Sequence, residues 1–154
     1  MLNEEELQKL EEESDIRIAG IYREYCRQMR EQKLMDYDDQ MLYAYNILRK
    51  DPGVLAYFQN RYPYICVDEA QDTSKIQHAI IALLAAGTGN LFMVGDEDQS
   101  IYGFRAAYPE ALLSFEKKHS GAKVLLMEEN FRSNAKIVEA ADKFIQKNTL
   151  RHEK

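Results

Sequence analysis

The sequence predicts an α/β protein in which a parallel sheet with flanking helices follows an all-helical segment. Up to about residue 60, apolar side chains recur at helical spacing, and from Tyr64 onward short apolar runs alternate with amphipathic helices. The runs are YICV (64–67), LFMV (91–94) and VLLM (124–127). Continuous apolar strands separated by helices are typical of a parallel sheet covered on both faces. We therefore expect a helical segment over residues 1–60 and the sheet over residues 61–154.

In the first segment, Asn3 and Asp36 are suitable helix caps. The apolar residues at helical spacing are Ile18, Tyr22, Tyr25 and Met29, followed by Met41, Leu42, Tyr45 and Leu48. DPG at 51–53 then interrupts the pattern, and VLAYFQN predicts a short helix before Pro63.

In the second segment, each apolar run precedes a helix. We expect helices over residues 74–86, 109–118 and 134–147, with Gly87 and Gly121 near the ends of the first two and Ser133 as the cap of the third. The histidines His78 and His119 fall on these helices, where a surface position is the simplest interpretation, and His152 is isolated.

The composition excludes several classes of protein. The chain has 154 residues, a formal charge of −6, and an acidic start that does not resemble a signal peptide. No apolar run approaches the roughly 20 residues of a membrane span, so we expect a cytoplasmic location without a membrane partner. A protein this acidic does not coat DNA by bulk charge, so any nucleic-acid contact must be local. Cys26 and Cys66 lack CxxC or CxxH neighbours, and we expect reduced thiols, with Cys66 in a core strand.

Acidic residues gather where the predicted strands end. Because the carboxyl ends of parallel strands meet at one edge, where such sheets bind ligands, these side chains are expected to converge. They are Asp68, Glu69, Asp72, Asp96, Glu97, Asp98, Glu128 and Glu129. Glu97, Asp98 and Glu128 are equally consistent with solvated loops.

Asp68 and Glu69 have a more specific interpretation. An aspartate that ends an apolar strand and is followed by glutamate is the Walker B arrangement of nucleotide hydrolases. Asp68 would hold Mg²⁺ mainly through water, and Glu69 would polarise the water that attacks the γ-phosphate of ATP. The cation would also relieve the repulsion between the carboxylates.

Three blocks in order, VDEAQDTS, MVGDEDQSIYGFRAA and LLMEENFRS, resemble motifs II, III and IV of the UvrD/Rep/PcrA family of superfamily 1 DNA helicases. The resemblance covers roughly residues 36–141. It implies a partial RecA-like P-loop NTPase sheet that belongs to an ATP-driven motor. Such a motor moves 3′ to 5′ along single-stranded DNA. Its DNA partner would be a single strand or a junction of single- and double-stranded DNA.

The resemblance also implies roles for individual residues. Asp68 resembles the Mg²⁺ ligand, Glu69 the catalytic base and Gln99 the sensor of the γ-phosphate. Arg132 resembles the arginine that reaches the γ-phosphate, and Phe131 matches the position that stacks on adenine.

Tyr102 and Phe104 match ring positions near the DNA bases, and core packing is the alternative. Sequence-independent stacking suits a translocating motor. Phe104 replaces a frequent tryptophan and Ala106-Ala107 a frequent Gly-Ala pair, which favours weaker stacking. Arg105 is interpreted as a partner of the local acids.

The phosphate-binding Walker A loop, GxxxxGK[ST], is absent from the sequence, and so are motifs V and VI. AAGTGN at 85–90 lacks the lysine and is expected to be a helix C-terminal loop. The simplest interpretation is an internal piece of a longer helicase, inactive alone, with the end of a subdomain 1B-like insertion and return helices in residues 1–60. The carboxyl-terminal half of subdomain 1A would follow, and the remaining subdomains would be its partners. An incomplete sheet predicts an exposed apolar edge or face, covered by self-association or by the helical segment.

Two alternatives stay open. The chain could be a truncated helicase-like module that binds a partner or DNA without turnover, or an unrelated Mg²⁺-dependent phosphohydrolase. The sequence does not distinguish DNA repair from replication restart or plasmid maintenance.

Overall fold

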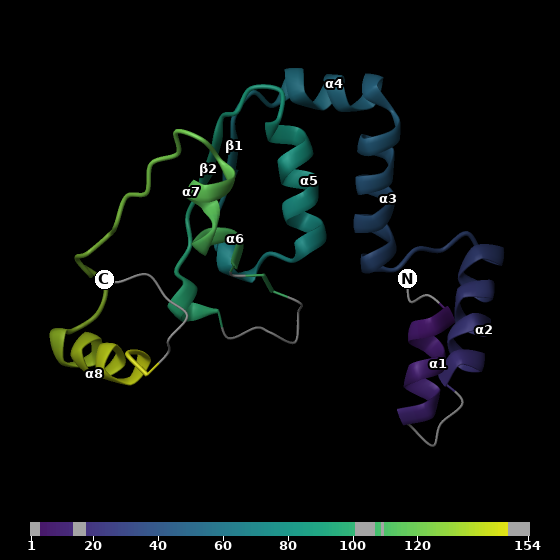
Figure 1. The fold of residues 1–154 in the computed structure, drawn as a ribbon, viewed down its shortest axis with the longest axis horizontal. Coiled ribbons are helices and arrows are strands. Elements are labelled where there is room, and N and C mark those ends of the chain that lie inside the picture. The colour runs from purple at the N-terminus through teal and green to yellow at the C-terminus, as the bar shows by residue number, and fades with distance from the viewer. Residues whose placement is uncertain (1–3, 14–17, 101–106, 109, 148–154) are drawn as a thin grey trace. The chain divides into compact units, whose positions relative to one another are not determined.

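A computed structural model describes residues 4–13, 18–100, 107–108 and 110–147, and it confirms the predicted α/β class (Figure 1). The chain divides into two compact units, with the boundary between residues 47 and 48. None of the described helices combines the length and hydrophobicity that crossing a bilayer requires.

The first unit is helical. It contains α1 (Glu4–Glu13), α2 (Ile18–Glu31) and most of α3 (Tyr37–Lys50), and α1 packs on α2. Leu7 and Ala19 are the buried apolar residues of this pair. Asp36 Oδ1 accepts a hydrogen bond of 2.8 Å from Asp39 N, which confirms Asp36 as the cap of α3.

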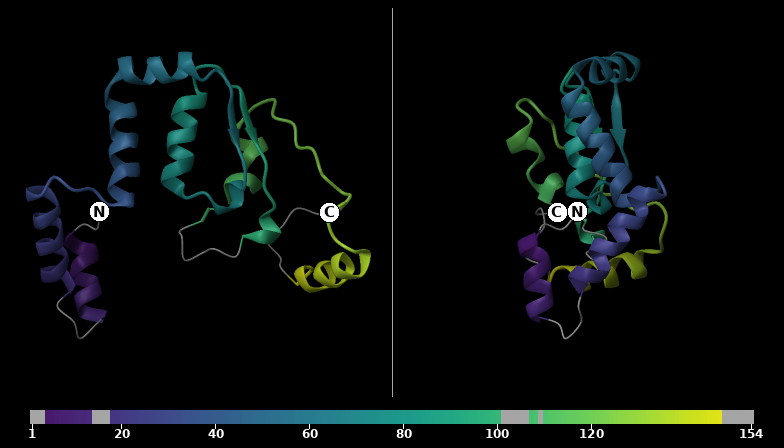
Figure 2. Two further views of the ribbon diagram at one scale, coloured as in Figure 1. Left: turned by 180° about the vertical axis from the view of Figure 1, so that it is seen from behind. Right: turned by 90° about the vertical axis from the view of Figure 1, so that its right-hand side faces the viewer.

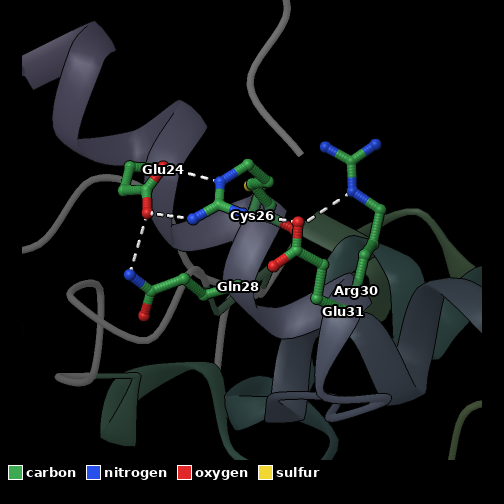
Figure 3. Close-up of polar contacts among 6 residues, drawn as sticks. Glu24, Cys26, Gln28, Arg30 and Glu31 are labelled. Carbon is green, nitrogen blue, oxygen red and sulfur yellow. Dashed lines mark hydrogen bonds and ion pairs between the residues drawn. The ribbon is translucent and has the colours of Figure 1, made fainter.

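The surface of α2 carries a line of charged and polar side chains (Figure 3). Arg27 pairs with Glu24 one turn before it and with Glu31 one turn after it. Gln28 Nε2 donates to Glu24 Oε1 at 2.9 Å, and Arg30 Nε donates to Cys26 O at 3.0 Å. Such pairs at helical spacing support a helix that has little buried surface.

The second unit begins within α3 and continues through α4 (Pro52–Arg61), which is capped by Asp51. Strands β1 (Ile65–Val67) and β2 (Leu91–Met93) then pair in parallel, with α5 (Lys75–Ala85) between them in sequence. Figures 1 and 2 show α5 running alongside this sheet, and α4 also contacts α5. Within the described residues the sheet has two strands.

Helix α5 forms where the sequence predicts it. Ser74 Oγ accepts a hydrogen bond from Gln77 N, and the Gln77 side chain accepts one from Ser74 N at 2.7 Å. This reciprocal capping satisfies two amide groups that a helix start leaves unpaired. The predicted end of the helix before Gly87 is also confirmed.

The predicted third strand at residues 124–127 is wrong. These residues have no sheet partner in the described structure, and Leu125 and Met127 are 81% and 89% exposed. An apolar run becomes a strand only where a neighbouring strand accepts its hydrogen bonds.

The predicted helix over 109–118 is divided into α6 (Glu110–Leu113) and α7 (Phe115–Lys118). Ser114 Oγ donates to Glu110 O at 2.5 Å, and this bond to the preceding turn competes with regular helical geometry. The last helix, α8 (Ala135–Ile145), is capped by Asn134 instead of the predicted Ser133, because Asn134 Oδ1 accepts from Lys136 N at 3.0 Å.

The two faces of the sheet differ. Leu91 and Met93 line a recess together with residues of α5, α6 and α7. Cys66 and Phe92, which are paired in register, lie on the other face, where Phe92 is 59% exposed. Cys66 is therefore exposed, and its predicted core position is wrong.

Candidate functional site

The strands β1 and β2 end at the same edge of the sheet, and each is followed by a short 3₁₀ turn. These turns are η1 (Ala70–Asp72) and η2 (Glu97–Gln99). Val94 N donates to Val67 O at 2.8 Å, and Ala70 N donates to Val94 O at 2.9 Å. Hydrogen bonding between the two chain segments thus continues into the turns and holds the acidic residues of both at one edge.

Gln71 joins the two turns. Its side chain is 1% exposed, the most buried polar group described. Its Nε2 donates to Glu69 Oε2 at 2.8 Å, and its Oε1 accepts from Asp96 N at 3.1 Å. A neutral amide can bond to a carboxylate and to a backbone N–H at once without adding charge, so Gln71 positions Glu69 relative to Asp96.

Glu69 lies in the left-handed region, with φ 48° and ψ 43°. This conformation is uncommon for a residue with a Cβ atom and is found at functional sites where neighbouring contacts maintain it. Asp68 Oδ1 accepts a hydrogen bond of 2.9 Å from Glu69 N, which closes the turn. Both carboxylates are exposed, as groups that meet a ligand must be.

Gly95 lets the two strand ends approach each other. A Cβ atom at this position would lie 2.7 Å from Gln71 Oε1, 2.7 Å from Leu112 Cδ1 and 3.2 Å from Ala70 N. The two distances of 2.7 Å are too short for a carbon atom, so a Cβ atom here would displace the side chains of Gln71 and Leu112.

The turn after β2 is organised by Asp96. Its Oδ1 accepts from Asp98 N at 3.2 Å, and its Oδ2 accepts from Gln99 Nε2 at 3.0 Å. Gln99 is exposed and Glu97 is buried. The Gln99 amide is therefore held at the same edge as Asp68 and Glu69 while its second N–H can reach a ligand.

The donor set is compatible with Mg²⁺. Among the described residues, no group of three or more histidine, cysteine or acidic side chains is arranged to hold a metal. Mg²⁺ does not need such a group, because it keeps several waters and binds one or two carboxylates together with substrate phosphates. Asp68 and Glu69 offer exposed carboxylates of this kind. Asp72 Oδ1, buried without a hydrogen-bond partner in the described part of the chain, is a further oxygen that water or a cation would satisfy.

Phe131 and Arg132 lie outside this network. Asn130 Oδ1 accepts from both Arg132 N and Ser133 N at 2.9 Å, which fixes the backbone of the loop. The Phe131 side chain is 91% exposed and that of Arg132 is also exposed. Glu128 and Glu129 are exposed in the same extended segment, so the structure does not gather all eight predicted carboxylates into one set of contacts.

Tyr102, Phe104 and Arg105 lie outside the described residues, and their predicted roles remain predictions. Sequence reasoning missed Gln71 and Gly95 as positioning residues. The available signal was local: Gln71 is a neutral amide among acids, and Gly95 directly follows an apolar strand.

The recess on the helical face of the sheet refines the expected surface position of His78. His78 is half-buried, and burial lowers its pKa. Its Nε2 lies 2.5 Å from Thr73 Oγ1. Because the single hydroxyl proton of Thr73 is donated to Ala70 O at 2.7 Å, the His78 Nε2–H is the donor in this contact. His78 is therefore half-buried with its ring bonded within the protein, and it is not a fully exposed surface residue.

Comparison with known proteins identifies the class. The model of the UvrD/REP helicase N-terminal domain matches residues 1–120. The chain therefore belongs to the UvrD/REP helicase family. Over 137 residues it is 42% identical to the ATP-dependent DNA helicase PcrA of Staphylococcus aureus (strain Mu50) and equally to that of Staphylococcus epidermidis (strain ATCC 35984). The matched region is 89% of this chain and 19% of each relative, so the chain spans about a fifth of their length.

Proposed function

We propose that this chain is a segment of an ATP-dependent 3′ to 5′ DNA helicase or translocase. The observation that carries the proposal is the bridge from Glu69 through Gln71 to Asp96. It ties the end of β1 to the end of β2 and so holds Asp68, Glu69 and the turn bearing Gln99 at one edge. Family membership supplies the reaction class, since the relatives are ATP-dependent DNA helicases by name.

In this proposal, residues 61–154 are part of a RecA-like sheet and the edge binds ATP with Mg²⁺. Asp68 acts as the Mg²⁺ ligand and Glu69 as the base that orients water toward the γ-phosphate. Gln99 senses that phosphate. The left-handed turn and the Gln71 amide fix the Glu69 carboxylate before substrate arrives, which lowers the reorganisation needed during reaction.

Arg132 and Phe131 complete the nucleotide site. The guanidinium of Arg132 is always charged and presents forked donors, which suits the charge that develops on the γ-phosphate. The Phe131 ring stacks on adenine. Their exposure and their distance in sequence from the turns fit groups that engage when the remaining helicase subdomains and the nucleotide are present.

Tyr102 and Phe104 are proposed to stack on bases of single-stranded DNA. Residues 1–60 correspond to the end of a 1B-like insertion with its return helices. The 3′ to 5′ direction rests on resemblance to the family.

The test is Glu69→Gln in the full-length parent protein. Loss of a general base lowers rates about 10²- to 10⁴-fold, so DNA-stimulated ATP hydrolysis should fall by at least 100-fold while a fluorescent ATP analogue still binds. Glu116→Gln, an exposed glutamate on α7, is the matched control. Unchanged hydrolysis in Glu69→Gln would show that another group is the base.

The alternative, a truncated binding module without turnover, is favoured by the absence of a Walker A sequence in these 154 residues. The mass of the native product, captured with an antibody to this segment, separates the two. A chain several times heavier than 17.9 kDa supports the motor, and a product of that mass supports the module. The isolated 154 residues should hydrolyse no ATP in either case, and turnover by them would contradict the need for Walker A.

A further inference from the structure

A recess lies between α5, β2 and the α6–α7 pair, on the helical face of the sheet. It has a volume of about 260 Å³. Much of its wall is apolar, formed by Ala79 and Ala82 of α5, Met93 of β2 and Phe115 of α7. The other lining residues include a tyrosine, two lysines and two histidines, which gives this apolar space a cationic and aromatic border.

Two lysines share the ring of Tyr108. Lys75 Nζ lies 5.0 Å from the ring centroid, and Lys118 Nζ lies 5.5 Å from it. Cation–π attraction holds each ammonium near the ring, but it does not neutralise the charge. Neither lysine forms an ion pair within the described residues, and both side chains are exposed. The site is thus a local positive patch in a chain of net charge −6.

The histidines extend the aromatic border. The His78 ring meets Tyr108 edge-on at 6.1 Å, and the His119 ring lies 4.5 Å from that of Phe115. Burial, and after it the nearby charge of Lys118, lowers the pKa of His78, which disfavours a positive charge on this imidazole. We therefore base the positive charge of the patch on its two lysines, Lys75 and Lys118.

The patch is fixed to the start of α5 and follows directly on the segment proposed to carry the DNA bases. Tyr108 N donates to Thr73 O at 2.9 Å, and Ala107 forms an isolated bridge with Ser74. Ala107 and Tyr108 are the next residues in the chain after 101–106, which contain Tyr102 and Phe104. Tyr108 therefore lies close in sequence to the two residues proposed to stack on DNA bases.

We propose that Lys75 and Lys118 bind backbone phosphates of single-stranded DNA, with Tyr108 and the apolar recess as the adjoining surface for a base or sugar. The inference rests on the proposed function and extends its DNA path. Lysines next to aromatic rings are the combination that proteins use to hold single strands without sequence preference. An acidic protein segment would also be attracted by the charge, but it would leave the aromatic border without a matching role.

The experiment measures binding of fluorescein-labelled oligo-dT to the full-length protein at several salt concentrations. The test variant is Lys75→Gln with Lys118→Gln. The control is Lys117→Gln with Lys123→Gln, which removes the same charge from exposed lysines outside the recess. Each phosphate contact on a single strand contributes about 0.7 to the slope of log K against log salt concentration. The test variant should therefore bind more weakly, with a slope shallower by about 1.4, and the control should match the unmodified protein.

A second measurement does not depend on how the variants fold. Lysines of the unmodified protein are acetylated with and without oligo-dT and quantified by mass spectrometry, with Lys117 as the internal reference. We expect DNA to protect Lys75 and Lys118 more than Lys117.

The double substitution Lys75→Arg and Lys118→Arg should retain the salt slope.

The outcomes separate the two levels of the proposal. Equal slopes for test variant and control, or equal acetylation of the three lysines, would overturn the DNA contact while leaving the helicase assignment intact. Unchanged DNA binding together with loss of an acidic protein partner would assign the patch to that partner and would also overturn the inference. Absence of any oligo-dT binding by the unmodified full-length protein would instead contradict the proposed function.

Discussion

Gln71 Nε2 lies 2.8 Å from Glu69 Oε2, and this contact connects a buried residue to an exposed, acidic one. Glu69 occupies a left-handed conformation that its neighbours must maintain. Because Gln71 also accepts a hydrogen bond from Asp96 N, its side-chain amide fixes the position of the end of β1 relative to the end of β2. The position of the proposed base is thus determined by a residue that does not itself face the ligand.

Replacing Gln71 by methionine should remove the hydrogen bonds that join Glu69 to Asp96. The part-buried Asp96 N would lose this acceptor, and a donor left unsatisfied on burial costs about 1 to 3 kcal/mol. We expect a loss of that size in the free energy of unfolding, measured by urea denaturation. In the full-length protein we expect kcat for ATP hydrolysis to fall more than the affinity for nucleotide changes, because the base is misplaced while the phosphate ligands remain.

The matched control is Gln146→Met at the C-cap of α8. The Gln146 side chain is exposed, and within the described residues its amide bonds only to Asp142 one turn earlier, at 2.7 Å. Its replacement should leave both stability and kcat nearly unchanged. Equal effects of the two substitutions would mean that Gln71 has no special positioning role.

Gly95→Ala should be destabilising although it adds a single methyl group. The new Cβ would lie 2.7 Å from both Gln71 Oε1 and Leu112 Cδ1. Overpacking of this kind costs about 1 to 3 kcal/mol, and thermal denaturation should show a lower Tm. Gly20→Ala in α2 is the control, because a Cβ there meets nothing within 4 Å and alanine favours a helix. A neutral Gly95→Ala would indicate that the strand ends can separate freely.

The sequence predicts best those features that depend on residues close to one another in the chain. Helix α5 is specified by Ser74 and Gln77, which cap each other within one turn. The acidic edge follows from the parallel pairing of two short strands whose ends must coincide. The bridge through Gln71 could not be predicted in the same way, because it depends on the approach of Asp96, which is distant in sequence.

The wrong predictions involve residues whose structure depends on a partner. VLLM at 124–127 has the composition of a strand, but no strand pairs with it in the described structure. Cys66 lies in an apolar strand, yet its face of the sheet is exposed because the described helices pack on the other face. Composition indicates that a segment can be buried. The fold determines which other elements, if any, cover it.

The exposed face predicts self-association of the isolated chain, the first of the two outcomes expected for an incomplete sheet. Phe92 is 59% exposed on this side, paired in register with Cys66, and Tyr64 directly before β1 is 74% exposed. Sedimentation velocity should show a mass that rises with concentration, and Phe92→Glu should reduce it because a charge in a dry contact is costly. Phe144→Glu, on exposed α8, is the control. A concentration-independent monomer would contradict this prediction.

The charge pattern of α2 predicts a specific response to pH. The hydrogen bonds from Arg27 and then from Gln28 lower the pKa of Glu24 from its ordinary value of 4.5 to about 2. Because the folded pKa is the lower one, the interaction stabilises the folded helix above pH 4.5, and this contribution is lost as the pH falls through about 2.

Arg27→Gln should return the Glu24 midpoint toward 4.5, measured from the ¹³C shift of its side-chain carboxyl during an acid titration. Arg30→Gln is the control, because Arg30 donates to the backbone of Cys26 and not to Glu24 (Figure 3). Since the pair is exposed, 1 M salt should also raise the midpoint of the unmodified chain by screening. A midpoint near 4.5 without any substitution would show that Arg27 does not hold Glu24 in solution.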